Sequence, residues 1–144
     1  VLKAAKILNI PVFATTQQRA KLGETCAELK LDAEDGVKTK VHADKSLFSM
    51  WTPEVQKAVH ELDSSSEGKL EAVVVGIESH ICVTQTTLDL LRDGHKVYVL
   101  ADAVSSCNKE EVPIALARLR AEGAVVTSSE SWMYECMGDA GIEE

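Results

Sequence analysis

Short runs of apolar residues alternate along the chain with stretches in which apolar positions recur at helical spacing. The short runs are rich in β-branched residues and predict five strands, centred near residues 12, 39, 73, 98 and 125. The helical spacing predicts helices near residues 1–9, 53–62, 80–92, 109–122 and from about 127 onward. Strands that alternate with helices favour an α/β protein with a parallel sheet covered on both faces. We therefore predict one three-layer αβα domain of Rossmann-like type over residues 1–144.

One of the predicted strands ends close to a cysteine. Residues 73–75 are three valines, Gly76 interrupts the run, and a helical pattern begins near His80. Cys82 is therefore expected where a strand leads into the N-terminus of a helix. Free backbone N–H groups and the helix dipole favour a thiolate there, and ligands usually bind at the carboxyl ends of parallel strands. The alternative, that Cys82 is a small buried apolar residue, is equally open at this point.

Charged residues are also predicted at this edge of the sheet. Lys45 lies in a polar segment, residues 42–51, before a helix that Thr52 can cap. Asp102 follows a strand, and residues 17–19 end another. A cation stabilises a thiolate, and a carboxylate can take the thiol proton. A solvated surface lysine is the alternative for Lys45, and a capping or loop-tying carboxylate is the preferred interpretation of Asp102.

Composition narrows the class of protein. The 144 residues are 45% apolar and 26% charged, which suits one globular domain, and contain no apolar run near 18 residues that would cross a membrane. The net charge of −8 disfavours binding to nucleic-acid phosphates. Four cysteines are scattered without a C-x-x-C pair, and four histidines are dispersed. We therefore expect a reduced protein with neither a metal site nor a cofactor.

The first residues already continue a helical pattern, without a start signal or an initiator methionine. We expect residues to precede Val1 in the whole protein, and any targeting segment would lie among them. A cytoplasmic location is predicted, and mitochondrial targeting is left open for this reason.

Two segments resemble those of one enzyme family. The sequence GIESHICV at residues 76–83, followed by TTLDLL at 86–91, resembles the nucleophile segment of the isochorismatase-like cysteine hydrolases, in particular the isochorismatase domain-containing proteins. The sequence KSLFSM at 45–50 resembles their catalytic-lysine segment, and residues 102–106 match a strand end that follows. The resemblance spans about residues 1–140. It implies an isochorismatase-like fold whose first central strand precedes residue 1 and is missing from this chain.

The resemblance also implies an Asp-Lys-Cys catalytic triad. It assigns Cys82 as the nucleophile and Lys45 as its positive partner. The triad Asp of the family lies upstream of residue 1, and neither Asp44 nor Asp102 is taken for it.

Two backbone features follow from the same resemblance. The N–H groups of Ile81 and Cys82 are expected to form an oxyanion hole, and the peptide bond between Ile77 and Glu78 is expected to be cis. Nicotinamidase members carry a metal-binding Asp and His pair, and we match no residues of this chain to that pair.

Aromatic side chains near these segments have two interpretations. Phe48, Trp51 and His80 are candidates for lining a substrate pocket, although core packing is preferred for Phe48 and Trp51. Trp132 and Met133 are candidates for a contact in a homo-oligomer, which the resemblance implies, or for core positions.

Three functional hypotheses follow. The leading one is a cysteine hydrolase that cleaves an amide, carbamoyl or enol-ether bond of a small molecule through a covalent intermediate. The second is an inactive isochorismatase fold that serves as a binding or oligomerisation module. The third, a nuclease or RNA-associated role, is disfavoured by the negative charge.

Overall fold

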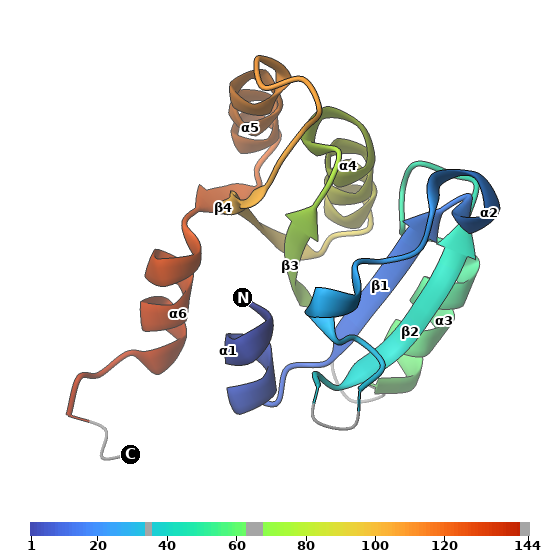
Figure 1. Ribbon diagram of the computed structural model, residues 1–144. Helices are drawn as coiled ribbons and strands as arrows, with labels where there is room; N and C mark the ends of the chain where they lie inside the picture. Colours follow the sequence, from blue (N-terminus) through green and yellow to red (C-terminus); the bar gives the residue numbers. More distant parts are fainter. Residues whose placement is uncertain (34–35, 63–67, 142–144) are drawn as a thin grey trace. The chain divides into compact units, whose positions relative to one another are not determined.

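The computed structural model describes residues 1–33, 36–62 and 68–141 (Figure 1). The chain forms two compact units, Val1–Gly68 and Lys69–Glu144. In both units, parallel strands pair with one another and helices pack beside them, which confirms the predicted α/β class. The five predicted strands are present. The extent of a single domain over 1–144 stays a prediction.

The first unit is built on two parallel strands. Its elements are α1 (Leu2–Ile7), β1 (Val12–Gln17), α2 (Arg19–Leu22), a 3-10 helix (Ala27–Leu29), β2 (Thr39–Lys45) and α3 (Pro53–Leu62). From Phe13 onward, β1 and β2 pair residue by residue, with Gln17 opposite Lys45 at their carboxyl ends. Helix α3 buries Val55 and Val59, which lie one turn apart on its apolar face.

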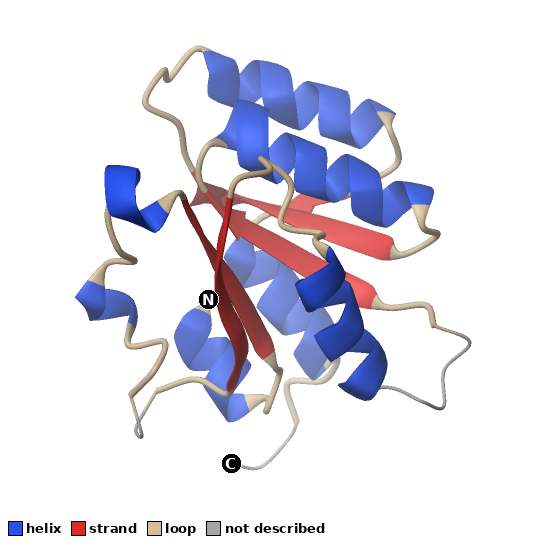
Figure 2. Ribbon diagram, turned by 90° about the vertical axis from the view of Figure 1, so that its right-hand side faces the viewer, coloured by secondary structure: helices blue, strands red, loops and turns tan. Residues whose placement is uncertain are grey.

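The second unit contains a three-stranded parallel sheet in the order β3-β4-β5. Its elements are β3 (Glu71–Gly76), a π-helix (Ser79–Val83), α4 (Thr84–Arg92), β4 (Lys96–Val104), α5 (Glu111–Ala121), β5 (Val125–Thr127) and α6 (Ser129–Met137). The crossover helices α4 and α5 lie on one face of this sheet, and α6 lies on the other (Figures 1 and 2).

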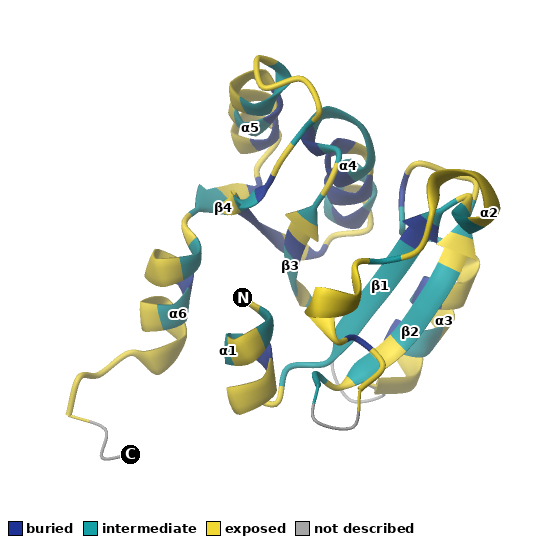
Figure 3. Cartoon of the chain, in the orientation of Figure 1, coloured by how far each residue is buried: buried dark blue, intermediate teal, exposed yellow. Residues whose placement is uncertain are grey.

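The core of the second unit lies on both sides of β4. Successive side chains of a strand point to opposite faces, so Val97 and Val99 face one helical layer while Tyr98 and Leu100 face the other. All four side chains are buried. The Tyr98 hydroxyl donates to Glu135 of α6 at 2.9 Å, so the side chains on the Tyr98 face of β4 point toward α6. Figure 3 shows this burial along β4 and the inner sides of α4 and α5.

Two strands extend further than the sequence predicts. Lys45 is the last residue of β2 rather than part of the following loop, and Asp102 lies within β4 rather than after it. In β2 the parallel pairing with β1 continues to the last residue, because Gln17 remains opposite Lys45. In β4 the pairing resumes after an irregularity, with Gly76 opposite Val104.

Candidate functional site

Cys82 lies in a π-helical turn between a strand and an α-helix. Strand β3 ends at Gly76, whose φ of +118° is a conformation that favours glycine, and the π-helix Ser79–Val83 continues directly into α4. The predicted helix therefore begins with wider turns than an α-helix, a form often found at functional sites. The Cys82 side chain is half-buried. The peptide bond between Ile77 and Glu78 is cis, where the resemblance places it.

The segment that follows β4 holds this turn in place. We refer to residues 105–108 as the 105–108 loop. Ser79 donates twice to the Ser105 carbonyl, from its backbone N–H at 2.8 Å and from its hydroxyl at 2.7 Å. The Ser105 N–H donates back to Gly76 at 3.2 Å. Ser79 is fully buried, so these hydrogen bonds satisfy polar atoms that water does not reach.

The side chains on either side of Ser79 contact the same loop. The Cys107 N–H donates to the Glu78 carboxylate at 2.7 Å, and Ser106 Oγ lies 3.1 Å from His80 Nδ1. The pKa of Glu78 is held below its usual range, chiefly by the Cys107 N–H and further by the Ser106 hydroxyl, the Cys107 thiol and the charge of His80, while burial opposes this shift. This contact could not be predicted from the sequence, because Glu78 and Cys107 are 29 residues apart.

The Ile81 N–H, which is expected to donate to an oxyanion, forms a hydrogen bond within the turn. The Ile81 N–H donates to the Glu78 carbonyl at 3.1 Å, and the Val83 N–H donates to the same oxygen at 3.1 Å. A substrate oxyanion at Ile81 would therefore have to replace the Glu78 carbonyl as acceptor. The role of this N–H group stays a prediction.

Lys45 is oriented by the carboxyl end of β1 and by the loop that follows its own strand, β2. Its ammonium group donates to Gln17 Oε1 at 2.5 Å and to the carbonyls of Leu47 and Phe48 at 2.9 Å each. The Gln17 amide also donates to the Ser46 carbonyl at 2.7 Å, so Gln17 ties the strand end to this loop. The solvated surface lysine considered above does not describe this residue, because its ammonium has three protein acceptors.

The aromatic candidates differ in their exposure. Phe48 is 49% exposed, so the preferred core position is wrong for this residue. Its carbonyl accepts from the Lys45 ammonium. Trp51 is half-buried. His80, also half-buried, contacts the 105–108 loop through Nδ1. Trp132 is buried in the core, and Met133 beside it is half-buried.

Asp44 and Asp102, which are not taken for the triad Asp, have structural partners. Asp102 accepts from the Ser129 N–H at 2.7 Å and from the Ser129 hydroxyl, which confirms that it caps α6. Asp44 accepts from the Thr16 hydroxyl and the Arg19 N–H at 2.9 Å each. These bonds hold the pKa of both carboxyls below the usual range, with Ser129 the main cause for Asp102 and the Arg19 N–H for Asp44.

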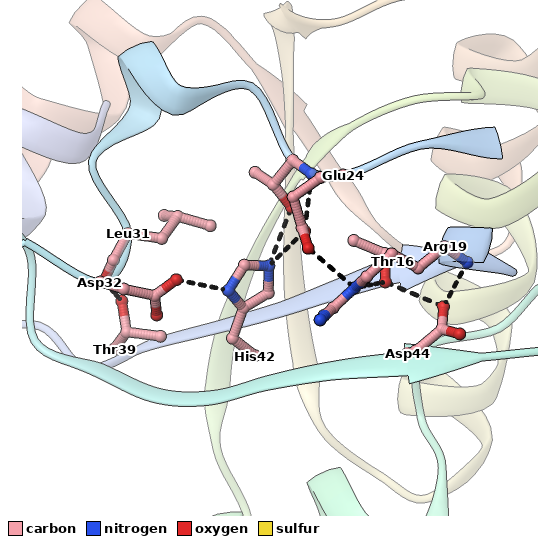
Figure 4. Close-up of polar contacts among 9 residues, drawn as sticks. Thr16, Arg19, Glu24, Leu31, Asp32, Thr39, His42 and Asp44 are labelled. Atoms are coloured by element: carbon pink, nitrogen blue, oxygen red, sulfur yellow. Dashed lines mark hydrogen bonds and ion pairs between the residues drawn. The ribbon is translucent and has the colours of Figure 1, made fainter.

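A polar cluster in the first unit has the outline of an acid-base-nucleophile triad (Figure 4). His42 Nδ1 lies 2.9 Å from Asp32, and His42 Nε2 lies 2.8 Å from the Thr25 hydroxyl. Glu24, however, accepts the Thr25 N–H at 2.8 Å and lies 3.6 Å from His42 Nε2. An oxyanion forming at Thr25 would meet this carboxylate instead of a donor. We therefore interpret the cluster as a structural set of hydrogen bonds that fixes the segment before β2 to β2 itself.

Among the described residues, no group of three or more His, Cys, Asp and Glu side chains is arranged to hold a metal ion. In the same part of the chain, every helix is too short or too polar to cross a membrane.

Comparison with known proteins adds the family. The model of the isochorismatase domain matches residues 1–131. This chain belongs to the isochorismatase family. It is 42% identical over 144 residues to the secreted isochorismatase effector Isc1 of Phytophthora sojae, and 41% identical over 140 residues to isochorismatase domain-containing protein 2 of Xenopus laevis. The matches cover 100% and 97% of this chain but 67% and 63% of those proteins, so the chain spans about two thirds of the length of these relatives.

Several solved structures are similar to this chain, and they carry different functional names. The MAR1 ribonuclease of Caenorhabditis elegans is 35% identical, with a TM-score of 0.80 over 97% of this chain and 68% of its own. YcaC of Pseudomonas aeruginosa, solved with hexane-2,5-diol and covalent acrylamide, is 27% identical, with a TM-score of 0.80 over 94% and 64%. YcaC of Escherichia coli, described as an octameric hydrolase of unknown specificity, is 25% identical, with a TM-score of 0.79 over the same shares.

Proposed function

We propose that this isochorismatase-family protein is a hydrolase of small molecules whose nucleophile is Cys82. The observation that carries the proposal is the position of this thiol. It lies half-buried in the π-helical turn after the carboxyl end of β3, and the buried Ser79 anchors that turn to the 105–108 loop. A nucleophile needs such a fixed direction of attack, because a small misplacement lowers the rate strongly.

The reaction would proceed through a covalent intermediate. For an amide substrate, the Cys82 thiolate attacks the carbonyl carbon, a C–S bond forms, the C–N bond breaks, and the amine leaves with the proton that the thiol gave up. Water then attacks the thioester, a C–O bond forms, the C–S bond breaks, and the acid and the free thiol are released. Carbamoyl and enol-ether substrates are the alternatives. The resemblance assigns the proton transfer to an Asp upstream of residue 1, and the oxyanion contacts to the N–H groups of Ile81 and Cys82.

Lys45 would supply the positive charge that a thiolate requires. The support within the first unit is the set of three hydrogen bonds, to Gln17, Leu47 and Phe48, that directs its ammonium group. The pairing of Lys45 with Cys82 is taken from the family resemblance. The side chains of Phe48, Trp51 and His80 are proposed to line the substrate site.

A related protein supports a reactive nucleophile. The structure of P. aeruginosa YcaC contains covalent acrylamide. Acrylamide is an electrophile that thiolates attack, and thiolates are the reactive form of cysteine. We extend this reactivity to Cys82.

The experiment that tests the proposal is a hydrolysis screen with the full-length protein against small amides, carbamoyl compounds and enol ethers. Cys82→Ala should abolish turnover, whereas Cys136→Ala, which removes an exposed thiol, should leave it unchanged. An acyl adduct on Cys82, seen by intact mass and peptide mapping after acid quenching, would identify the intermediate. Hydrolysis that survives Cys82→Ala would contradict the proposal.

A second candidate is RNA cleavage, because the C. elegans structure is that of a ribonuclease and is 35% identical to this chain. The net charge of −8 opposes it. RNA cleavage by the purified protein that is lost in Cys82→Ala would favour this candidate. Cleavage that persists in that variant would indicate a contaminating nuclease.

The remaining alternative is a non-catalytic binding or oligomerisation module. An inert Cys82 together with a stable oligomer would favour it. We propose a homo-oligomer in either case, because E. coli YcaC is octameric, and light scattering of the full-length protein tests this. We also propose a cytoplasmic location. Because the relative Isc1 is named as secreted, imaging of the tagged full-length protein is needed to test this location.

A further inference from the structure

Glu78 connects two parts of the second unit through opposite ends of the same residue. Its carboxylate accepts from the Cys107 N–H of the 105–108 loop at 2.7 Å. Its backbone carbonyl accepts from Ile81 and Val83 at 3.1 Å each, the bonds with which the π-helical turn begins. Cys82 lies between these two donors in the sequence. A displacement of Glu78 would therefore move the acceptor on which the Cys82 turn is built.

The loop side of this contact is itself ordered. Ser106 Oγ accepts from the Asn108 N–H at 3.1 Å and lies 3.1 Å from His80 Nδ1. The Cys107 N–H is the donor that contacts the Glu78 carboxylate directly, and Ser106 orders the loop beside this contact. An ionised carboxylate can only accept hydrogen bonds, so it suits this donor.

Charge makes this arrangement stronger than a neutral one. Hydrogen bonds to a carboxylate are shorter and roughly twice as strong as those between neutral groups. A glutamate is ionised at neutral pH, and the pKa of Glu78 is lowered further, first by the Cys107 N–H, so the folded state favours the charged form. Ser79, between Glu78 and His80, anchors the backbone of the same turn to Ser105. We call the hydrogen bond between the Glu78 carboxylate and the Cys107 N–H the Glu78 latch.

We propose that Glu78 is a positioning residue for Cys82, and that the Glu78 latch holds the π-helical turn in the conformation that directs the thiol. This inference rests on the proposed function, because it concerns the reactivity of the same cysteine. A purely structural role would instead require that the latch stabilises the fold without affecting the thiol.

The test uses the full-length protein and three variants. Glu78→Gln keeps the size and one acceptor but removes the charge, and Ser106→Ala removes the hydroxyl that orders the adjoining loop through His80 and Asn108. Glu71→Gln is the matched control, because it removes a carboxylate from the first residue of the preceding strand, where it pairs with Lys96 at 3.1 Å on the exposed surface. Alkylation of each cysteine is followed by peptide mass spectrometry, and exchange of the Cys107 amide hydrogen reports on the latch directly.

We expect the Cys82 alkylation rate to fall about tenfold in Glu78→Gln, the size expected when a charged hydrogen bond is weakened, and to fall less in Ser106→Ala. The Cys107 amide should exchange faster in Glu78→Gln, while Cys26 should react at an unchanged rate in every variant. Glu71→Gln should behave as the wild type in both measurements.

Three outcomes would count against these ideas, and they are distinguishable. If Cys82 reacts quickly in the wild type and equally quickly in Glu78→Gln, the positioning role is overturned and the proposed function stands. If the Cys82 rate falls to the same extent in Glu71→Gln, the effect is one of general charge or stability, and the positioning role is again overturned. If Cys82 in the wild type is no more reactive than an ordinary thiol, the proposed function fails, and the positioning role fails with it.

Discussion

Gln17 Oε1 accepts a hydrogen bond from Lys45 Nζ at 2.5 Å, across the carboxyl ends of two paired strands. The same amide donates to the Ser46 carbonyl, so one side chain fixes both the ammonium group and the loop that covers it. Gln17 is therefore the side-chain acceptor that directs the Lys45 ammonium, beside the carbonyls of Leu47 and Phe48.

Gln17→Met should weaken the function that we assign to Lys45. Methionine has a similar length but no amide, so the ammonium would lose one acceptor and the loop one donor. We expect the rate of Cys82 alkylation to fall several-fold, because a less well directed cation stabilises the thiolate less. Gln85→Met, on the exposed side of α4, is the control. An unchanged rate in Gln17→Met would mean that the other acceptors suffice to direct Lys45.

Ser79→Ala tests how firmly the nucleophile turn is anchored. The substitution removes the 2.7 Å hydroxyl bond to Ser105 but keeps the 2.8 Å bond from the backbone. The Ser105 carbonyl thus keeps a partner, and the free energy of unfolding should fall by about 1 kcal/mol. Urea unfolding measures this. In Ser131→Ala, at an exposed position on α6, the free energy of unfolding should fall by clearly less. An equal loss in both variants would show that the Ser79 hydroxyl contributes nothing specific.

Asp102→Asn should give a pH-dependent loss of stability. The pKa of Asp102 is lowered from 3.8 by the Ser129 hydroxyl and N–H, so the folded state favours the ionised carboxyl. This stabilisation is present above pH 3.8 and is lost as the pH falls through the folded-state pKa. The variant should therefore unfold at a lower temperature than the wild type at pH 7, and the difference should shrink in acid.

Glu130→Gln provides the control for that measurement, since it removes a negative charge from the first turn of the same helix without changing the Asp102 cap. A difference between Asp102→Asn and the wild type that stays constant from pH 7 to pH 3 would contradict the assignment of the cap.

The packing of α5 can be tested with two residues of one helix. Leu119 is fully buried, whereas Ile114 is 63% exposed. Leu119→Ala should lower the free energy of unfolding by about 2–5 kcal/mol, because it creates a cavity in the core. Ile114→Ala should change it by about 0.5 kcal/mol or less. Similar losses in the two variants, measured by denaturant unfolding, would contradict this orientation of the helix.

The strands and helices could be predicted because their signals are local. Three valines precede Gly76, and Pro53 follows the capping residue Thr52, so both elements can be recognised within a few neighbouring residues. The π-helical turn at Ser79–Val83 could not be predicted, because its spacing depends on backbone contacts of the folded unit. The strand end at Lys45 was missed because it depends on pairing with β1.

The candidate site was predicted in part for the same reason. Cys82 and Lys45 lie in segments that resemble those of the family. Asp102 lies near the end of a predicted strand, where capping carboxylates are common. The contacts of Glu78 with Cys107 and of Gln17 with Lys45 join residues 29 and 28 positions apart. No spacing rule along the chain connects such residues, and only folding brings them together.

The central claim is that Cys82 is an activated nucleophile, and competition among the four cysteines tests it most directly. Cys26, Cys107 and Cys136 are exposed, whereas Cys82 is half-buried, so accessibility alone would make Cys82 the slowest to react. We predict that limiting acrylamide at pH 6.5 labels Cys82 of the full-length protein first, and that Lys45→Ala removes this preference. Labelling in the order of exposure, with Cys82 last in both proteins, would contradict the account.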